Sequence, residues 1–244
     1  MTDGIRVAMW SGPRNISTAM MRSFSSRGDC AVTDEPFYGA FLKQSGEPQP
    51  MAAETMADMD CDWQSVADAM SGDIPAGKTV WYQKHMPHHM IGPIDIMDFP
   101  QHRHAFLIRD PDLVVASYEA KNDLRAADLL GFTKLVDYHK RISDQLGHAA
   151  PVFDSNEILA DPQGQLSRLC AAIDIEWDEA MLSWPKGSHP ADGIWGAHWY
   201  GAVNSSTGFG APTPFKTLSD AGRKIADECR VDYEYLASFR WAAS

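Results

Sequence analysis

The sequence has 244 residues, 44% of them hydrophobic, and it carries a formal net charge of −12. This length and apolar content suit a single α/β domain over residues 1–244 and would be cramped for two domains. The acidic balance argues against a broad nucleic-acid-binding face, because phosphate backbones are held by clustered Lys and Arg. Any anionic ligand must therefore be met by a few local cations.

The cysteines and the apolar runs indicate the compartment. The four cysteines form no CxxC pair, which argues against a zinc ribbon or a disulfide scaffold and favours reduced thiols. No run reaches the roughly 18 apolar residues of a membrane span. We therefore expect a cytoplasmic protein without a membrane segment. The sequence leaves the oligomeric state open, a homo-oligomer included.

Apolar runs alternate with helical patterns, which is typical of βαβ units and a mainly parallel sheet. The strands are predicted at 5–10, 30–33, 79–83, 104–109 and 151–153. The helices are predicted at 15–26, 63–70, 111–121, 128–146, 162–173 and 219–240. Segments 44–60 and 185–216 are predicted to be irregular. An irregular segment as long as the second is more often a lid or substrate loop than filler.

The first motif, WSGPRNISTAM at 10–20, follows the first predicted strand. A turn through Gly12 and Pro13 into a helix near Asn15 would direct free backbone N–H groups and the positive end of the helix dipole at one point, which attracts phosphate or sulfate. Further donors come from Arg14, Ser17 and Thr18. The Lys and second Gly of the ATP-binding P-loop are absent. An ordinary strand-turn-helix junction remains an alternative.

A second motif, WYQKHMPHHM, places Lys84 and His85 at the end of a strand. A His beside a cation is well suited to proton transfer, because its ordinary pKa lies near neutral pH. His88 and His89 are better explained as loop or surface residues. The histidine spacing fits no standard zinc motif, so no metal site is predicted.

A third motif, FLIRDPDLVVASYEAKN, ends a strand at Arg109 and places Ser117 about two turns into the next helix. Open α/β sheets bind ligands at this end of their strands, and an Arg can grip a phosphate with two hydrogen bonds. Alternatively, Arg109 pairs with an acidic side chain and Ser117 lies on the surface. Asp110 is the expected N-cap of this helix, with Pro111 at its first position.

Together the three motifs resemble those of the sulfotransferases that use 3'-phosphoadenosine 5'-phosphosulfate. PRNIST at 13–18 is similar to the family loop PxSGTT, which cradles the 5'-phosphosulfate. Arg109 and Ser117 match the spacing of the family Arg and Ser that hold the 3'-phosphate. QKHMP at 83–87 resembles the family strand end KTHLP, with His85 in the place of the catalytic base. The motifs also occur in the family order.

The resemblance covers residues 5 to about 190 and implies a P-loop NTPase-like three-layer α/β fold with a central, mainly parallel sheet flanked by helices. It implies in-line transfer of a sulfuryl group to a hydroxyl or amine of a small-molecule acceptor, without a metal. The catalytic residues that it implies are His85, Arg14 and Lys84. The cofactor-binding residues that it implies are Gly12, Pro13, Arg14, Asn15, Ile16, Ser17, Thr18, Arg109, Ser117 and, from a late PKG, Lys186.

Two departures from the family pattern bear on donor binding. Asn15 and Ile16 replace the usual Ser-Gly, so a positive φ at this point of the loop would strain Ile16. Ser155 stands where the family often has a Tyr near the adenine. The contacts to the adenine are therefore in doubt.

Two further stretches are assigned to the acceptor. Glu35, next to Asp34 in TDEPFYGAFL, could orient an acceptor or act as a base, whereas Asp34 is equally suited to cap a helix. Trp199, in the aromatic stretch 195–200, could line the acceptor pocket or stack on adenine, although simple packing of the loop is an alternative. We therefore expect Glu35 and Trp199 to bind the substrate.

Two other functions fit parts of the pattern. An ATP-dependent P-loop phosphotransferase would need a loop Lys beside Ser or Thr and an Asp for magnesium, and the Lys is missing. A non-catalytic nucleotide-binding protein of the same fold is the second alternative, because fold alone does not specify activity.

Overall fold

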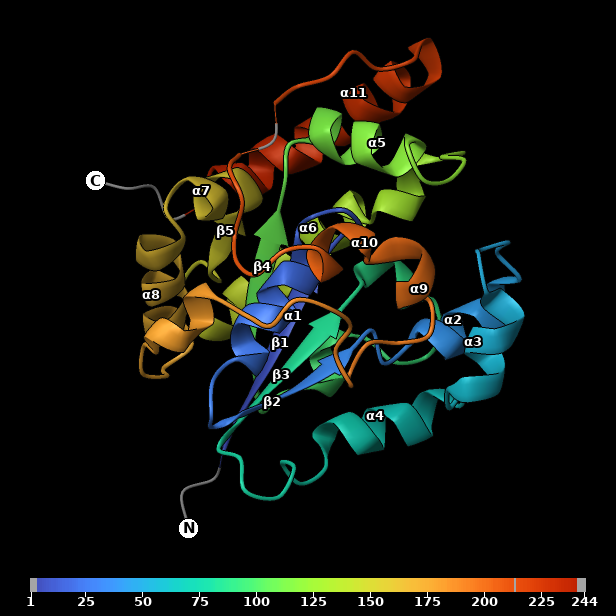
Figure 1. Ribbon diagram of the computed structural model, residues 1–244. Coiled ribbons are helices and arrows are strands. Elements are labelled where there is room, and N and C mark those ends of the chain that lie inside the picture. The colour runs from blue at the N-terminus through green and yellow to red at the C-terminus, as the bar shows by residue number, and fades with distance from the viewer. Residues whose placement is uncertain (1–3, 213, 241–244) are drawn as a thin grey trace. The chain divides into compact units, whose positions relative to one another are not determined.

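The computed structural model describes residues 4–212 and 214–240. The chain forms an α/β fold in which helices flank one five-stranded parallel sheet (Figure 1). The strand order is β2-β3-β1-β4-β5. The alternation of apolar runs and helical patterns therefore predicts the fold class correctly.

The strands are short runs of mostly buried residues. They are β1 (Ile5–Ser11), β2 (Cys30–Asp34), β3 (Val80–His85), β4 (His102–Ile108) and β5 (Val152–Asp154). All five predicted strands are confirmed. Two registers matter for the site, because Asp34 of β2 lies opposite Lys84 of β3, and Ile108 of β4 lies opposite Asp154 of β5.

Six predicted helices are also confirmed. They are α1 (Ser17–Ser25), α4 (Trp63–Ser71), α5 (Pro111–Glu119), α6 (Phe132–Leu146), α8 (Pro162–Ala172) and α11 (Asp220–Ala237). The Asp110 side chain accepts a hydrogen bond from Asp112 N at 2.9 Å, with Pro111 at the first helical position, as predicted. Short 3₁₀ turns are η1 (Pro87–His89), η2 (Ile96–Asp98), η3 (Ala127–Leu130) and η4 (Glu179–Leu182).

The prediction that 44–60 is irregular is wrong in part. The segment holds the end of α2 (Tyr38–Ser45) and all of α3 (Ala52–Asp58). Pro48 and Pro50 lie between these helices, and Gly46, with a φ of 64°, ends α2. Helix α7 (Ser155–Ala160) was not predicted either. The described residues of 185–216 contain only the short helices α9 (Gly196–Trp199) and α10 (Gly201–Asn204).

The described backbone divides into two compact units. The first unit comprises residues 4–9, 18–103 and 178–209, and the second comprises 10–17, 104–177, 210–212 and 214–240. That the chain forms a single domain stays a prediction. Within the described ranges, no helix has both the length and the apolar character that crossing a bilayer would require.

Candidate functional site

The loop between β1 and α1 has a strained backbone. Arg14 and Ile16 have φ angles of 64° and 54°, in the left-handed region that β-branched residues adopt only at a cost of about 1–3 kcal/mol. The sequence predicts strain at Ile16 if its φ is positive, and the φ angle is positive. Alternating left-handed and right-handed residues turn successive backbone N–H groups into a concavity that favours anions.

Close contacts within the second unit fix this loop. A Cβ on Gly12 would lie 2.3 Å from the carbonyl oxygen of Leu130, so only glycine fits there. Ser155 Oγ lies 2.9 Å from Asn15 O and 2.8 Å from Ile108 O. The residue that replaces the family Tyr thus ties the loop to the end of β4.

The second unit also brings the loop to the predicted Arg and Ser. Arg14 Nε donates to Ser117 Oγ at 3.0 Å, and Arg109 Nη1 donates to Arg14 O at 2.7 Å. The alternative was that Arg109 pairs with an acidic side chain. Among the described residues Arg109 instead donates to a backbone carbonyl and forms no ion pair. Ser117 is half-buried rather than a free surface residue.

The charge on Arg109 lies in an environment that an anion would improve. Arg109 is buried, with 5% of its surface exposed, and its Nε has no hydrogen-bond partner among the described residues. Burial lowers the pKa of Arg109, and the nearby positive charge of Arg14 lowers it further. A bound phosphate or sulfate would accept the buried N–H and offset the repulsion between the two guanidinium groups.

In the first unit, Lys84 is the centre of a buried cluster. Its Nζ lies 2.8 Å from Asp34 Oδ1, 2.7 Å from Glu35 Oε1 and 2.8 Å from the Tyr200 hydroxyl oxygen. Thr18 Oγ1 lies at 3.3 Å, also within reach. Burial alone would lower the pKa of Lys84, but the two carboxylates outweigh it and raise that pKa. Lys84 is therefore a protonated, fully engaged cation.

The other members of this cluster are set by the same contacts. The Tyr200 hydroxyl donates to Asp34 Oδ2 at 2.6 Å and accepts from Trp195 Nε1 at 3.0 Å. The alternative role of Asp34 as a helix N-cap is wrong, because α2 begins four residues later and has no side-chain cap. Glu35 has a φ of 45°. Burial and the adjacent Glu35 raise the pKa of Asp34.

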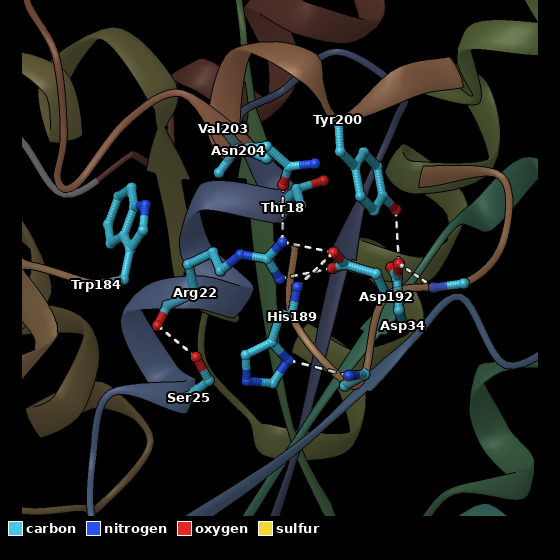
Figure 2. Close-up of polar contacts among 12 residues, drawn as sticks. Thr18, Arg22, Ser25, Asp34, Trp184, His189, Asp192, Tyr200, Val203 and Asn204 are labelled. Carbon is cyan, nitrogen blue, oxygen red and sulfur yellow. Dashed lines mark hydrogen bonds and ion pairs between the residues drawn. The ribbon is translucent and has the colours of Figure 1, made fainter. Parts of the chain in front are cut away.

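A second buried ion pair holds the segment 184–209, which we call the strap. Figure 2 shows the Arg22 guanidinium of α1 facing the carboxylate of Asp192 in the strap. Two hydrogen bonds of 2.6 Å join the two groups, and Arg22 Nη2 also donates to Asn204 Oδ1 at 3.1 Å. Tyr200 of the strap meets Asp34 in the same view. The strap is thus fastened at two points within the first unit.

His85, the predicted base, is buried near the end of β3. Gln83 donates through its Nε2 to Met70 O, so its Oε1 is the acceptor for the Nε2 atoms of both His85 and His102, each at 3.1 Å. This assignment makes Nδ1 the basic nitrogen of His85. The His85 ring packs against Phe37 and Phe99.

The remaining predicted residues differ in their surroundings. Lys186 is exposed in the first unit. Trp199 is half-buried and packs against an aromatic cluster that includes Tyr38, Phe41 and Trp195, which agrees with the packing alternative for this loop. Pro13 is half-buried and Ser17 is buried. Over residues 4–212 and 214–240, no group of three or more His, Cys, Asp or Glu side chains could hold a metal ion.

Sequence reasoning missed Arg22 and Asp192 as residues that organise the site. The two residues are 170 positions apart in the sequence, and no local pattern indicates that an Arg on a helix will pair with an Asp in a distant loop. Tyr200 falls in the aromatic stretch 195–200, but the sequence does not indicate its hydrogen bond to Lys84. One signal could have pointed to Arg22: it is a charged residue at a buried position of α1, and such residues are usually paired.

Comparison with known proteins agrees with the motifs. A family model described as a sulfotransferase domain matches residues 5–226, which confirms the predicted resemblance. The chain is 35% identical over 231 residues to a branched-chain-amino-acid aminotransferase-like protein 2 of Arabidopsis thaliana, and the match covers 93% of this chain. The chain spans only about 40% of the length of that relative.

Solved structures agree on the fold. A sulfotransferase from Alicyclobacillus acidocaldarius superposes with a TM-score of 0.54 at 12% identity, over 98% of this chain and 95% of that one. The sulfotransferase domain from the curacin biosynthetic pathway gives 0.51 at 13% identity, over 93% and 97% of the two chains. At these identities the likeness concerns the fold, which is P-loop NTPase-like as predicted.

Proposed function

This chain belongs to the sulfotransferase domain family, and on that premise we propose that it transfers a sulfuryl group from 3'-phosphoadenosine 5'-phosphosulfate to a hydroxyl or amine of a small molecule. The bond from sulfur to the acceptor atom forms as the bond from sulfur to the 5'-phosphate oxygen breaks. The acceptor proton passes to a base of the chain, and 3',5'-bisphosphoadenosine leaves. A metal has no part in this scheme.

The observation that carries the proposal is the pair of guanidinium groups in the second unit. Arg109 is buried beside Arg14, and its Nε has no hydrogen-bond partner among the described residues. A buried N–H without an acceptor is costly unless a ligand supplies one. Ser117 is held by Arg14 at 3.0 Å. These three side chains fit the phosphate groups of the donor in charge and hydrogen-bonding type.

The loop supplies the rest of the proposed donor grip. Its strained residues and the start of α1 offer backbone N–H groups and the positive end of a helix dipole. Negative charge that develops on the leaving phosphate would be stabilised by these groups and by Arg14. The loop residues that we assign to the donor are Gly12, Pro13, Arg14, Asn15, Ile16, Ser17 and Thr18. Lys186 is a further proposed cation for the 3'-phosphate.

For the acceptor, we assign residues of the first unit. Both His85 and Glu35 could take the acceptor proton, since the Nδ1 of His85 is basic and the Glu35 carboxylate belongs to a cluster in which two acids share one Lys. Lys84 must exchange one of its present partners if it is to donate to substrate. Trp199 is assigned to the wall of the acceptor pocket.

The proposal includes a cytoplasmic location, which agrees with four cysteines that form no disulfide. The Arabidopsis thaliana relative named above is longer than this chain, so any role of its additional segments belongs to that protein. Acceptor identity and oligomeric state are not part of the proposal.

A thermal-shift experiment tests the donor assignment. At 100 times its dissociation constant, 3',5'-bisphosphoadenosine should add about 2.7 kcal/mol to the free energy of unfolding. Adenosine 5'-monophosphate, which lacks the 3'-phosphate, and ATP are the control ligands. We expect a shift with the bisphosphate that Arg109→Ala abolishes. A wild-type protein that responds to ATP and not to the bisphosphate would favour the phosphotransferase alternative.

A further inference from the structure

Two carboxylates flank Arg109 within the second unit. Asp110 is the next residue in the chain, and Asp154 lies opposite Ile108 in the β4–β5 register, one position before Arg109. Each attracts Arg109 and raises its pKa, although burial and Arg14 outweigh them. Neither forms an ion pair with Arg109 among the described residues. The question is what keeps these two acids from neutralising the guanidinium.

Helix α11 engages both acids. Arg230 Nη1 lies 2.8 Å from Asp110 Oδ2, and its Nη2 lies 3.3 Å from Asp110 Oδ1 and 2.7 Å from Asp112 Oδ1. The Tyr233 hydroxyl donates to Asp154 Oδ2 at 3.0 Å. Helix α11 packs along α5 (Figure 1), so both side chains approach from the same element.

Each of these two carboxylates also accepts a hydrogen bond from a backbone N–H group. Asp110 Oδ1 accepts from Asp112 N at 2.9 Å, and Asp154 Oδ1 accepts from Asn156 N at 2.8 Å. Each carboxylate is therefore oriented by a helix N-terminus on one side and by α11 on the other. Within the described part of the chain, Arg109 keeps only its hydrogen bond to Arg14 O, and its Nε has no partner.

We propose that Arg230 and Tyr233 of α11 are positioning residues for anion binding, which hold Asp110 and Asp154 so that Arg109 remains available to an exogenous phosphate. Arg230 acts mainly by charge, because it offsets a carboxylate that would otherwise both attract Arg109 and repel the ligand. Tyr233 acts by hydrogen bonding. This inference rests on the proposed donor site. It adds to that site two supporting residues that lie outside the motifs at 12–18 and 109–117.

The test measures the dissociation constants of 3',5'-bisphosphoadenosine and inorganic pyrophosphate by calorimetry. Arg230→Gln should raise both constants about tenfold, the effect of one uncompensated charge several ångströms from the ligand. Arg223→Gln is the matched control, because Arg223 lies on the same helix and pairs with Asp112 at 2.8 Å but not with Asp110. We expect that variant to bind like the wild type.

A double variant separates charge from structure. Adding Asp110→Asn to Arg230→Gln removes the uncompensated carboxylate, and Asn can still cap α5. We expect the double variant to recover most of the lost affinity. If the ion pair were merely structural, the double variant would bind as weakly as Arg230→Gln, and that result would overturn the inference.

The other outcomes also decide between the two proposals. Unchanged binding in Arg230→Gln refutes the role of α11 while leaving the donor site intact. Binding of pyrophosphate alone, weakened by Arg230→Gln and restored in the double variant, supports the role of α11 and counts against the nucleotide assignment. A wild-type protein that binds neither anion overturns both.

Discussion

The buried pair of Arg22 and Asp192 allows a quantitative test of how the strap is held. The Arg22 side chain is 2% exposed and that of Asp192 is 10% exposed. Asp192→Asn keeps the shape and one acceptor oxygen but removes the charge that balances Arg22. Removing one partner of a buried ion pair costs about 3–5 kcal/mol. Because Asn still accepts one hydrogen bond, we expect the lower end, about 3 kcal/mol.

The assay is equilibrium unfolding in urea with a parallel thermal scan. For a chain of this size, 3 kcal/mol corresponds to a fall in Tm of about 6–12 °C. Asp123→Asn provides the same substitution in an exposed pair, where Arg125 and Asp123 are 53% and 76% exposed. That control should change the free energy of unfolding by no more than about 0.5 kcal/mol.

A charge-free pair identifies the cause of the effect. Arg22→Met combined with Asp192→Leu removes both charges and retains comparable volume, so it should be more stable than Asp192→Asn alone. The reasoning would be refuted if Asp192→Asn unfolded at the wild-type urea concentration. It would also be refuted if the double variant were the less stable of the two.

Two further substitutions probe the loop and a buried histidine. Gly12→Ala should lower the free energy of unfolding by about 1–3 kcal/mol, because its Cβ would meet Leu130 O at 2.3 Å, whereas Gly28→Ala, which meets nothing within 4 Å, should be neutral in the same urea titration. Burial and the nearby Lys84 hold the pKa of His89 well below its usual value, so the unfolded state takes up a proton below about pH 6.5 that the folded state does not, and stability falls on acidification. We expect the free energy of unfolding, measured by urea titration at several pH values from 7 to 5, to fall less steeply with pH in His89→Phe than in the wild type. The difference in slope should be up to about 1.4 kcal/mol per pH unit, and an unchanged dependence on pH would contradict this.

The strands and long helices were predictable because they depend on local patterns. Buried apolar runs fix the strands, and Asp110 with Pro111 fixes the start of α5. Helix α3 was missed because Pro48 and Pro50 indicate an irregular segment, although they occupy only the connection between α2 and α3. The composition of a segment does not show whether its prolines make the whole segment irregular or only separate two helices.

The site was predictable only in part, and for a physical reason. Arg109 and Ser117 follow from the rule that ligands bind at the ends of parallel strands, and the loop follows from its position after β1. The contacts of Arg22 with Asp192, and of Tyr200 with Lys84, join residues 170 and 116 positions apart. Such pairs depend on tertiary packing, which a single sequence does not specify.

An acidic chain can hold a polyanion if its carboxylates near the site are engaged elsewhere. The net charge of −12 acts weakly at a distance, because ions screen interactions beyond about 8 Å at physiological salt. What a phosphate at Arg109 experiences is therefore set by its immediate neighbours: Arg14, Asp110 and Asp154. Two of these three are acids, and both are bound by α11. At the proposed donor site, the balance of charge would thus depend on α11, whose Arg230 lies 120 positions after Asp110 in the sequence.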